Sequence, residues 1–87
     1  MIKTLTPDNR RNICGNNIAR MRKERGFSQR QLAEKLQVYG LIIDKNAIQR
    51  IESGKRILTD IEALALCKTF DVSFEELASP FSIIVHD

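Results

Sequence analysis

One short stretch of the sequence, KNAIQRIESGKR at 45–56, concentrates side chains that hydrogen-bond in fixed geometries. A helix predicted over residues 45–53 places Ile48 and Ile51 on an apolar face. The opposite, outward face carries four polar residues: Lys45, Asn46, Gln49 and Arg50. Arg and Lys donate to guanine, and Asn and Gln pair bidentately with adenine, so this face is suited to reading base edges in a DNA major groove. An ordinary amphipathic surface helix would show the same pattern, so the flanking residues have to decide.

Polar residues on both sides of this helix are suited to phosphate oxygens. Gln29 falls in the first turn of a helix predicted over residues 28–39. There its side-chain amide and the free backbone amides could both meet a phosphate. Lys55 and Arg56 directly follow the outward-facing helix, in the sequence SGKR. Cations at a helix C-terminus also offset the helix dipole, and the two interpretations are compatible.

The net charge of +3 conceals an uneven distribution along the chain. Residues 1–58 carry thirteen Lys and Arg against five Asp and Glu, a balance of +8. Residues 59–87 carry one Lys against six acidic residues, a balance of −5, and the two together make +3. A basic front half indicates a polyanionic partner, although a solvated charged surface alone would have the same composition.

Length and composition exclude several classes of protein. A chain of 87 residues with 43% hydrophobic and 29% charged residues is expected to form one small soluble domain. No apolar run approaches the ~18 residues that a membrane-spanning helix needs. The N-terminal sequence MIKTLTPDNRR lacks the apolar core of a secretion signal. The expected location is therefore the cytoplasm.

The sequence offers no set of residues for catalysis or metal binding. Cys14 and Cys67 are far apart and His86 is the only histidine, a spacing that fits no zinc pattern. We interpret both cysteines as buried apolar residues. Without a nucleophile–histidine pair or a phosphate-binding glycine loop, we expect the protein not to be an enzyme. No cofactor, metal or small-molecule ligand is expected.

Apolar spacing and capping signals predict an all-α domain with short connections. Helices are predicted at 13–25, 28–39, 45–53, 60–70 and 74–78. The sequences SQRQ, TDIE and SFEE predict capping boxes at three of the helix starts, and three glycines are predicted to end helices. Residues 1–12 are expected to be a flexible arm, 13–78 the domain, and 79–87 a short extended C-terminal tail. The expected core residues are Leu32, Ala33, Leu36, Ile48, Ile51, Leu64 and Leu77.

These motifs resemble those of a known family of helix-turn-helix proteins. The chain is similar to the Cro/CI-type domains of the xenobiotic response element (XRE) family through NNIARMRKERGFSQRQLAEKL, NAIQRIESGKR and TDIEALALCKTFDVSFEEL. The similarity covers about residues 13–78, and its more specific parts are RKERGFSQ, SQ..LA..L and I..IE.GKR. It implies a compact five-helix, phage-repressor-like fold and sequence-specific binding to operator DNA.

The resemblance also implies roles for individual residues. The implied base contacts are made by Lys45, Asn46, Gln49 and Arg50. The implied phosphate contacts are made by Gln29, Ser53, Lys55 and Arg56. In related repressors an arginine near the end of the first helix pairs with the glutamate of the IE.G motif, which implies a structural pair of Arg22 and Glu52. Because a glutamate carries the wrong sign for DNA, we interpret it as part of the scaffold.

The connection before the outward-facing helix is longer than the usual three or four residues. Its sequence, VYGLIID, resembles a variant of the family with a lengthened turn. Gly40 is predicted to end one helix and Asp44 to cap the next. Ile43 is then spaced to pack on Ile48 as a hydrophobic staple. A partner contact and scattered surface exposure both remain open for Tyr39, Leu41 and Ile42.

The expected partner is double-stranded operator DNA, pseudo-palindromic and bound by a homodimer, because such domains usually bind as two-fold pairs. The acidic half and the apolar tail FSIIV are candidate self-association surfaces, although packing of the tail on its own domain or a disordered tail remains open. Two functions compete. One is a transcriptional repressor that acts by occupying an operator. The other is a protein-binding module, such as an antitoxin or anti-repressor partner.

Overall fold

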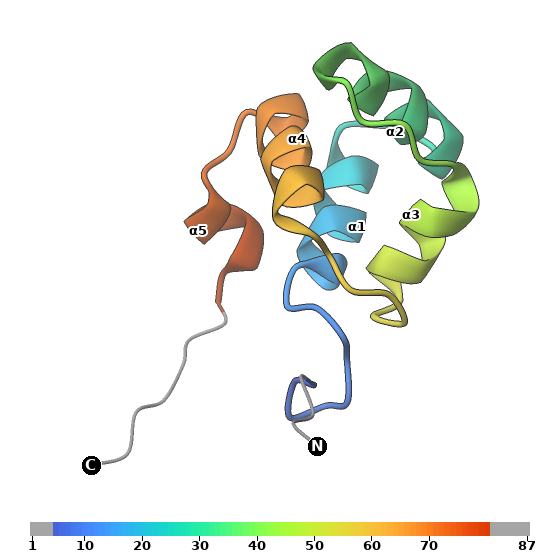
Figure 1. The fold of residues 1–87 in the computed structure, drawn as a ribbon. Coiled ribbons are helices and arrows are strands. Elements are labelled where there is room, and N and C mark those ends of the chain that lie inside the picture. Colours follow the sequence, from blue (N-terminus) through green and yellow to red (C-terminus); the bar gives the residue numbers. More distant parts are fainter. Residues whose placement is uncertain (1–4, 81–87) are drawn as a thin grey trace.

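The computed structural model describes residues 5–80 and contains five α-helices (Figure 1). Their bounds are α1 Gly15–Glu24, α2 Gln29–Leu36, α3 Lys45–Glu52, α4 Asp60–Phe70 and α5 Phe74–Ala78. A 3-10 turn, η1 Gln37–Tyr39, continues α2. No strand occurs among the described residues. The prediction of an all-α, five-helix fold is confirmed, and every helix bound lies within three residues of its predicted position.

The helices begin and end where local side-chain chemistry dictates. All three predicted capping boxes are present, at Ser28, Thr59 and Ser73, and each satisfies an amide that the helix leaves unpaired. Gly26 and Gly40 have φ values of 75° and 81°, a conformation that ends a helix and that a side chain would oppose. These signals involve neighbours within a few residues, which is why the sequence predicts them well.

The core is formed where α1, α2, α3 and α4 meet, and α5 closes it from the side of α4 away from α3 (Figure 1). Six of the seven predicted core residues are buried: Leu32, Ala33, Leu36, Ile48, Ile51 and Leu77. The prediction that Leu64 is a core residue is wrong, because it is 59% exposed. Helix α4 instead buries Ala63, Leu66 and Phe70.

The reason for this error lies in the composition of α4. Its sequence, DIEALALCKTF, is apolar on nearly every side, so apolar spacing alone does not identify the inward face. A polar contact decides the orientation. Glu62 is 5% exposed and accepts a 2.8 Å hydrogen bond from Arg56, which turns the side of α4 that carries Glu62 and Leu66 inward. Ile61 and Leu64 consequently face solvent.

The start of α1 is tied to the end of α3 by residues upstream of the first helix. The side-chain amide of Asn12 donates to the carbonyls of Ile51 and Arg56 at 2.9 and 2.8 Å. Its carbonyl oxygen accepts from the amides of Cys14 and Gly15, so Asn12 caps α1 from outside the helix. Residues 10–12, expected in the arm, are therefore bonded to the domain, whereas residues 1–4 lie outside the described part.

Gly15 permits a close approach between α1 and α3. A Cβ atom at this position would overlap the carbonyl oxygen of Ile51 and lie 2.9 Å from that of Glu52. The absence of a side chain therefore sets the distance at which the two helices cross. Within residues 5–80, no helix is long and apolar enough to cross a membrane.

Candidate nucleic-acid interface

The outward face of α3 presents polar side chains that the fold does not use. Its members are all exposed: Lys45, Asn46, Gln49 and Arg50. Within residues 5–80 none of these side chains makes a hydrogen bond or an ion pair. Ile48 and Ile51 on the other face are only 2% and 1% exposed. The arrangement leaves a full set of donors available for an external partner.

The start of α3 is fixed by the residue that precedes it. The Asp44 carboxylate accepts a 2.8 Å hydrogen bond from the amide of Ala47, which confirms the predicted cap. Ile43 is half-buried and packs against the core cluster that contains Ile48, as a hydrophobic staple requires. Both contacts hold the first turn of α3, where Lys45 and Asn46 are presented.

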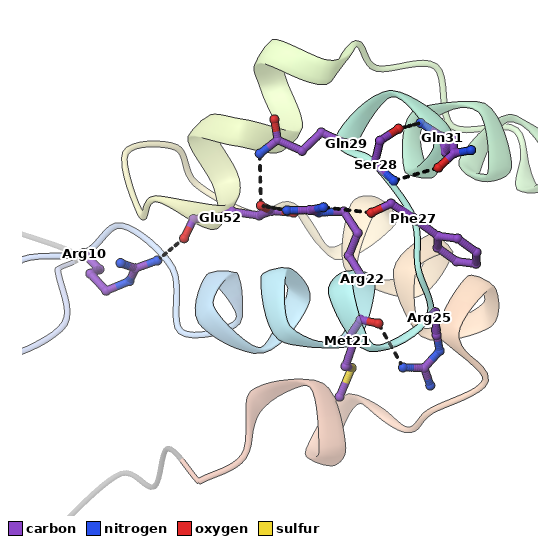
Figure 2. Close-up of polar contacts among 9 residues, drawn as sticks. All are labelled: Arg10, Met21, Arg22, Arg25, Phe27, Ser28, Gln29, Gln31 and Glu52. Atoms are coloured by element: carbon purple, nitrogen blue, oxygen red, sulfur yellow. Dashed lines mark hydrogen bonds and ion pairs between the residues drawn. The ribbon is translucent and has the colours of Figure 1, made fainter.

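Behind the outward face, a buried ion pair joins α1 to α3 (Figure 2). The Arg22 guanidinium donates to both carboxylate oxygens of Glu52, with Nε–Oε2 at 2.7 Å and Nη2–Oε1 at 3.0 Å. Both residues are 9% exposed. Hydrogen bonding to Glu52 raises the pKa of Arg22 even though burial acts in the opposite direction, so the guanidinium keeps its charge. The third nitrogen of Arg22, Nη1, donates to the carbonyl of Phe27.

Two more side chains converge on Glu52 from other parts of the chain (Figure 2). The Gln29 side-chain amide, at the start of α2, donates to Glu52 Oε1 at 3.1 Å. The Arg10 guanidinium donates to the backbone carbonyl of Glu52. Glu52 therefore joins α1, α2, α3 and the N-terminal segment at one point. A residue with the wrong charge for DNA holds the helix that carries the available donors.

The residues expected at phosphates differ in how free they are. Lys55 is exposed just beyond α3, and within the described part of the chain its side chain has no partner. Ser53 is half-buried and its hydroxyl donates to the carbonyl of Arg50 at 3.2 Å. Gln29 is half-buried against Glu52. Only the lysine is both charged and unoccupied.

Arg56 has an intramolecular role that sequence analysis missed. Its Nη1 lies 2.8 Å from Glu62 Oε2, in an ion pair whose side chains are 31% and 6% exposed. Glu62 also accepts from the amide of Thr59 as part of the α4 capping box. Arg56 thus fixes the loop between α3 and α4 to the start of α4. A basic residue after a helix gives no local signal that its partner lies six residues later.

Arg10 and Asn12 were likewise not recognised from the sequence. Their contacts with the end of α3 span 39 to 44 residues, a separation that no local pattern reveals. The Arg10 guanidinium also packs over Gly54, where a Cβ atom would lie 2.7 Å from its Cζ. These residues brace the loop that carries Lys55.

The lengthened turn is partly buried. Leu41 is half-buried against the core, while Ile42 is 82% exposed and Tyr39 48% exposed. Val38, which sequence analysis did not single out, is 79% exposed. The structure thus assigns one of the three open residues to packing and leaves the other two on the surface.

A comparison with protein-family models matches a family described as helix-turn-helix, of the XRE kind, over residues 18–77. The chain belongs to this family. The matched range runs from within α1 to the end of α5, and α2 and α3 form the helix-turn-helix unit itself. The XRE-family domain is that of a DNA-binding regulator. No curated protein and no solved structure is significantly similar to the chain.

Proposed function

We propose that this protein is a sequence-specific transcriptional repressor that acts by occupying an operator. The observation that carries the proposal is the outward face of α3. Four exposed hydrogen-bonding side chains have no partner within the described residues, and a buried ion pair holds the helix behind them. Donors held in a fixed position are what recognition of base edges requires.

Each residue of this face has a distinct proposed role. Arg50 donates in bidentate fashion to guanine, and Asn46 and Gln49 pair with adenine. Lys45, at the N-terminal edge of α3, reaches either a guanine or the adjoining phosphate. Because α3 enters the major groove in this motif, the four side chains would read successive base pairs of one half-site.

The proposed phosphate contacts lie on both sides of α3. Lys55 and Ser53 approach the backbone beyond its C-terminus, and Gln29 approaches it from the start of α2 while its amide nitrogen stays bonded to Glu52. For Arg56 we revise the expectation. Its ion pair with Glu62 positions the loop that carries Lys55, and any phosphate contact comes second to that role.

A homodimer on a pseudo-palindromic operator follows from the size of one domain. A single recognition helix covers only one half-site, and two-fold dimers of this motif bind half-sites centred roughly 34 Å apart, one turn of the duplex. A repressor of this kind would work in the cytoplasm. A signal that controls it would have to act through a partner or through the amount of protein made.

The second candidate function is that of a protein-binding module, such as an antitoxin or anti-repressor partner. The exposed apolar side chains of the turn, Val38, Tyr39 and Ile42, favour it, since such residues can form a contact surface. These residues lie beside the helix-turn-helix unit and not on the outward face of α3. We therefore rank this function second.

The test is selection of bound sequences from a random pool of DNA duplexes, followed by titration of the selected site against salt. The repressor proposal expects one enriched motif and an affinity that falls linearly with salt on a logarithmic scale. Lys55→Ala should weaken binding to all sequences alike and reduce that slope by about 1 per site contacted. A pool without enrichment would contradict the proposal and favour the protein-binding module.

A further inference from the structure

An apolar groove of about 790 Å³ runs along one side of α4. Its walls are the start of α1, the outer side of α4 and the loop that leads to α5. Cys14 and Ala63 at its base are buried, whereas Leu64 and Phe74 on its rim are 59% and 53% exposed. Among the described residues that line it, none belongs to α2 or α3. The groove is therefore separate from the outward face of α3.

The surface around this groove is apolar beyond what a solvated helix needs. Ile57 and Ile61, which lie before and within α4, are 59% and 69% exposed in addition to the two rim residues. Concentrated exposed apolar surface of this kind marks a contact site, and covering it removes apolar area from water. The question is which segment covers the groove.

The path of the described chain leads to one end of the groove. Ser79 and Pro80 line a smaller hollow of about 350 Å³. Asn12 and Ile13 line this hollow as well as the groove, so the two are neighbours. The next residues, 81–87, lie outside the described part of the chain. They follow directly from a point beside the groove.

The sequence of this following segment suits the groove in pattern and in length. FSIIVHD alternates apolar residues so that Phe81, Ile83 and Val85 share one side of an extended chain. Seven extended residues span roughly 23 Å. The 11-residue helix α4, along which the groove runs, is about 16 Å long. The segment is thus long enough to cover it.

We propose that residues 81–85 dock in extended form into the α4 groove of their own chain, with Phe81, Ile83 and Val85 directed inward. Attachment at Pro80, beside the groove, gives the segment a high effective concentration there, which a second copy of the protein would not have. Docking would cover Leu64, Phe74 and the half-buried thiol of Cys67, which also lines the groove. The inference does not depend on DNA binding.

Alkylation of Cys67 by iodoacetamide tests the proposal on the full chain without DNA. The rate at this residue is followed by peptide mass mapping, at a fixed alkaline pH and well below the melting temperature of each variant. Ile83→Asp should undock the segment and raise the rate severalfold. The matched control is Ile84→Asp, which places the same charge on the opposite side of the extended segment and should leave the rate unchanged.

The chemistry of the thiol makes the expected result specific. Burial raises the pKa of Cys67, and the charge of Glu76 raises it further. A carboxylate introduced nearby would therefore lower the thiolate fraction and slow the reaction. A faster reaction in Ile83→Asp would report access to the thiol and not an electrostatic effect.

A second variant tests the groove itself. Leu64 is exposed in the described structure, so Leu64→Asp should fold, and it should raise the Cys67 rate by about the same factor as Ile83→Asp. The double variant should then show no further increase, because both changes abolish the same contact. Independent, multiplying effects of the two substitutions would contradict docking.

Three other outcomes would overturn the proposal. Equal Cys67 rates in Ile83→Asp and the unchanged protein would show that the segment does not cover the groove. Equal acceleration by Ile84→Asp would exclude the proposed extended register. Protection of Cys67 that grows with protein concentration, together with a dimer mass in solution, would show that a second copy occupies the groove.

Discussion

Replacing Glu52 by glutamine removes the charge that balances a buried arginine while nearly conserving shape. Arg22 is 9% exposed and donates to both Glu52 oxygens, at 2.7 and 3.0 Å. Its pKa is raised, chiefly by this hydrogen bonding, so it cannot become neutral near pH 7. Leaving a buried charge without its partner costs about 3–5 kcal/mol. Since small domains unfold with about 5–15 kcal/mol, Glu52→Gln should remove a large part of the total.

The assay is urea unfolding at neutral pH, with the free energy of unfolding taken from midpoint and slope. The matched control is Glu34→Gln, because Glu34 pairs with Arg30 at 3.5 Å on the surface, with side chains 63% and 82% exposed. That pair should contribute less than about 0.5 kcal/mol. Replacing both buried partners, as in Arg22→Met with Glu52→Leu, should recover much of the loss. A Glu52→Gln loss as small as that of the control would refute the reasoning.

Further predictions concern packing, and urea or thermal unfolding checks each of them. Leu66→Ala should cost about 2–5 kcal/mol because Leu66 is 1% exposed, whereas Leu64→Ala should cost no more than about 0.5 kcal/mol; equal losses would contradict the orientation of α4. Gly15→Ala should destabilise by roughly 1–3 kcal/mol through overlap with the end of α3, and an unchanged midpoint would show that the helices separate freely. Ile43→Ser should lower the melting temperature with little effect on sequence preference, and an unchanged melting temperature would exclude the staple.

The parts of the fold that the sequence predicted depend on nearby residues. The capping boxes at Ser28, Thr59 and Ser73 join positions three residues apart, and an αL glycine such as Gly40 ends a helix by its own backbone conformation. The outward face of α3 was equally predictable, because its apolar residues occupy one side only. Local chemistry and a clear period are sufficient in these cases.

The parts that could not be predicted depend on contacts between distant residues or on a helix without a clear period. Asn12 caps α1 and binds the end of α3 through hydrogen bonds that span up to 44 residues. The ion pair of Arg56 with Glu62 sets which side of α4 faces inward, and an almost uniformly apolar helix gave no other indication. Both contacts arise only once the helices have packed, so apolar spacing placed Leu64 on the wrong side.

The measurement that tests the central claim most directly is the affinity of the unchanged protein and of Arg50→Ala for the selected duplex and for its single-base variants. Arg50 is exposed on α3 and has no partner among the described residues. We expect Arg50→Ala to weaken binding to the preferred site by about 1–3 kcal/mol and to lose discrimination at one base pair while keeping it elsewhere. An Arg50→Ala protein with an unchanged sequence preference would contradict the assignment of this face as the reader of DNA.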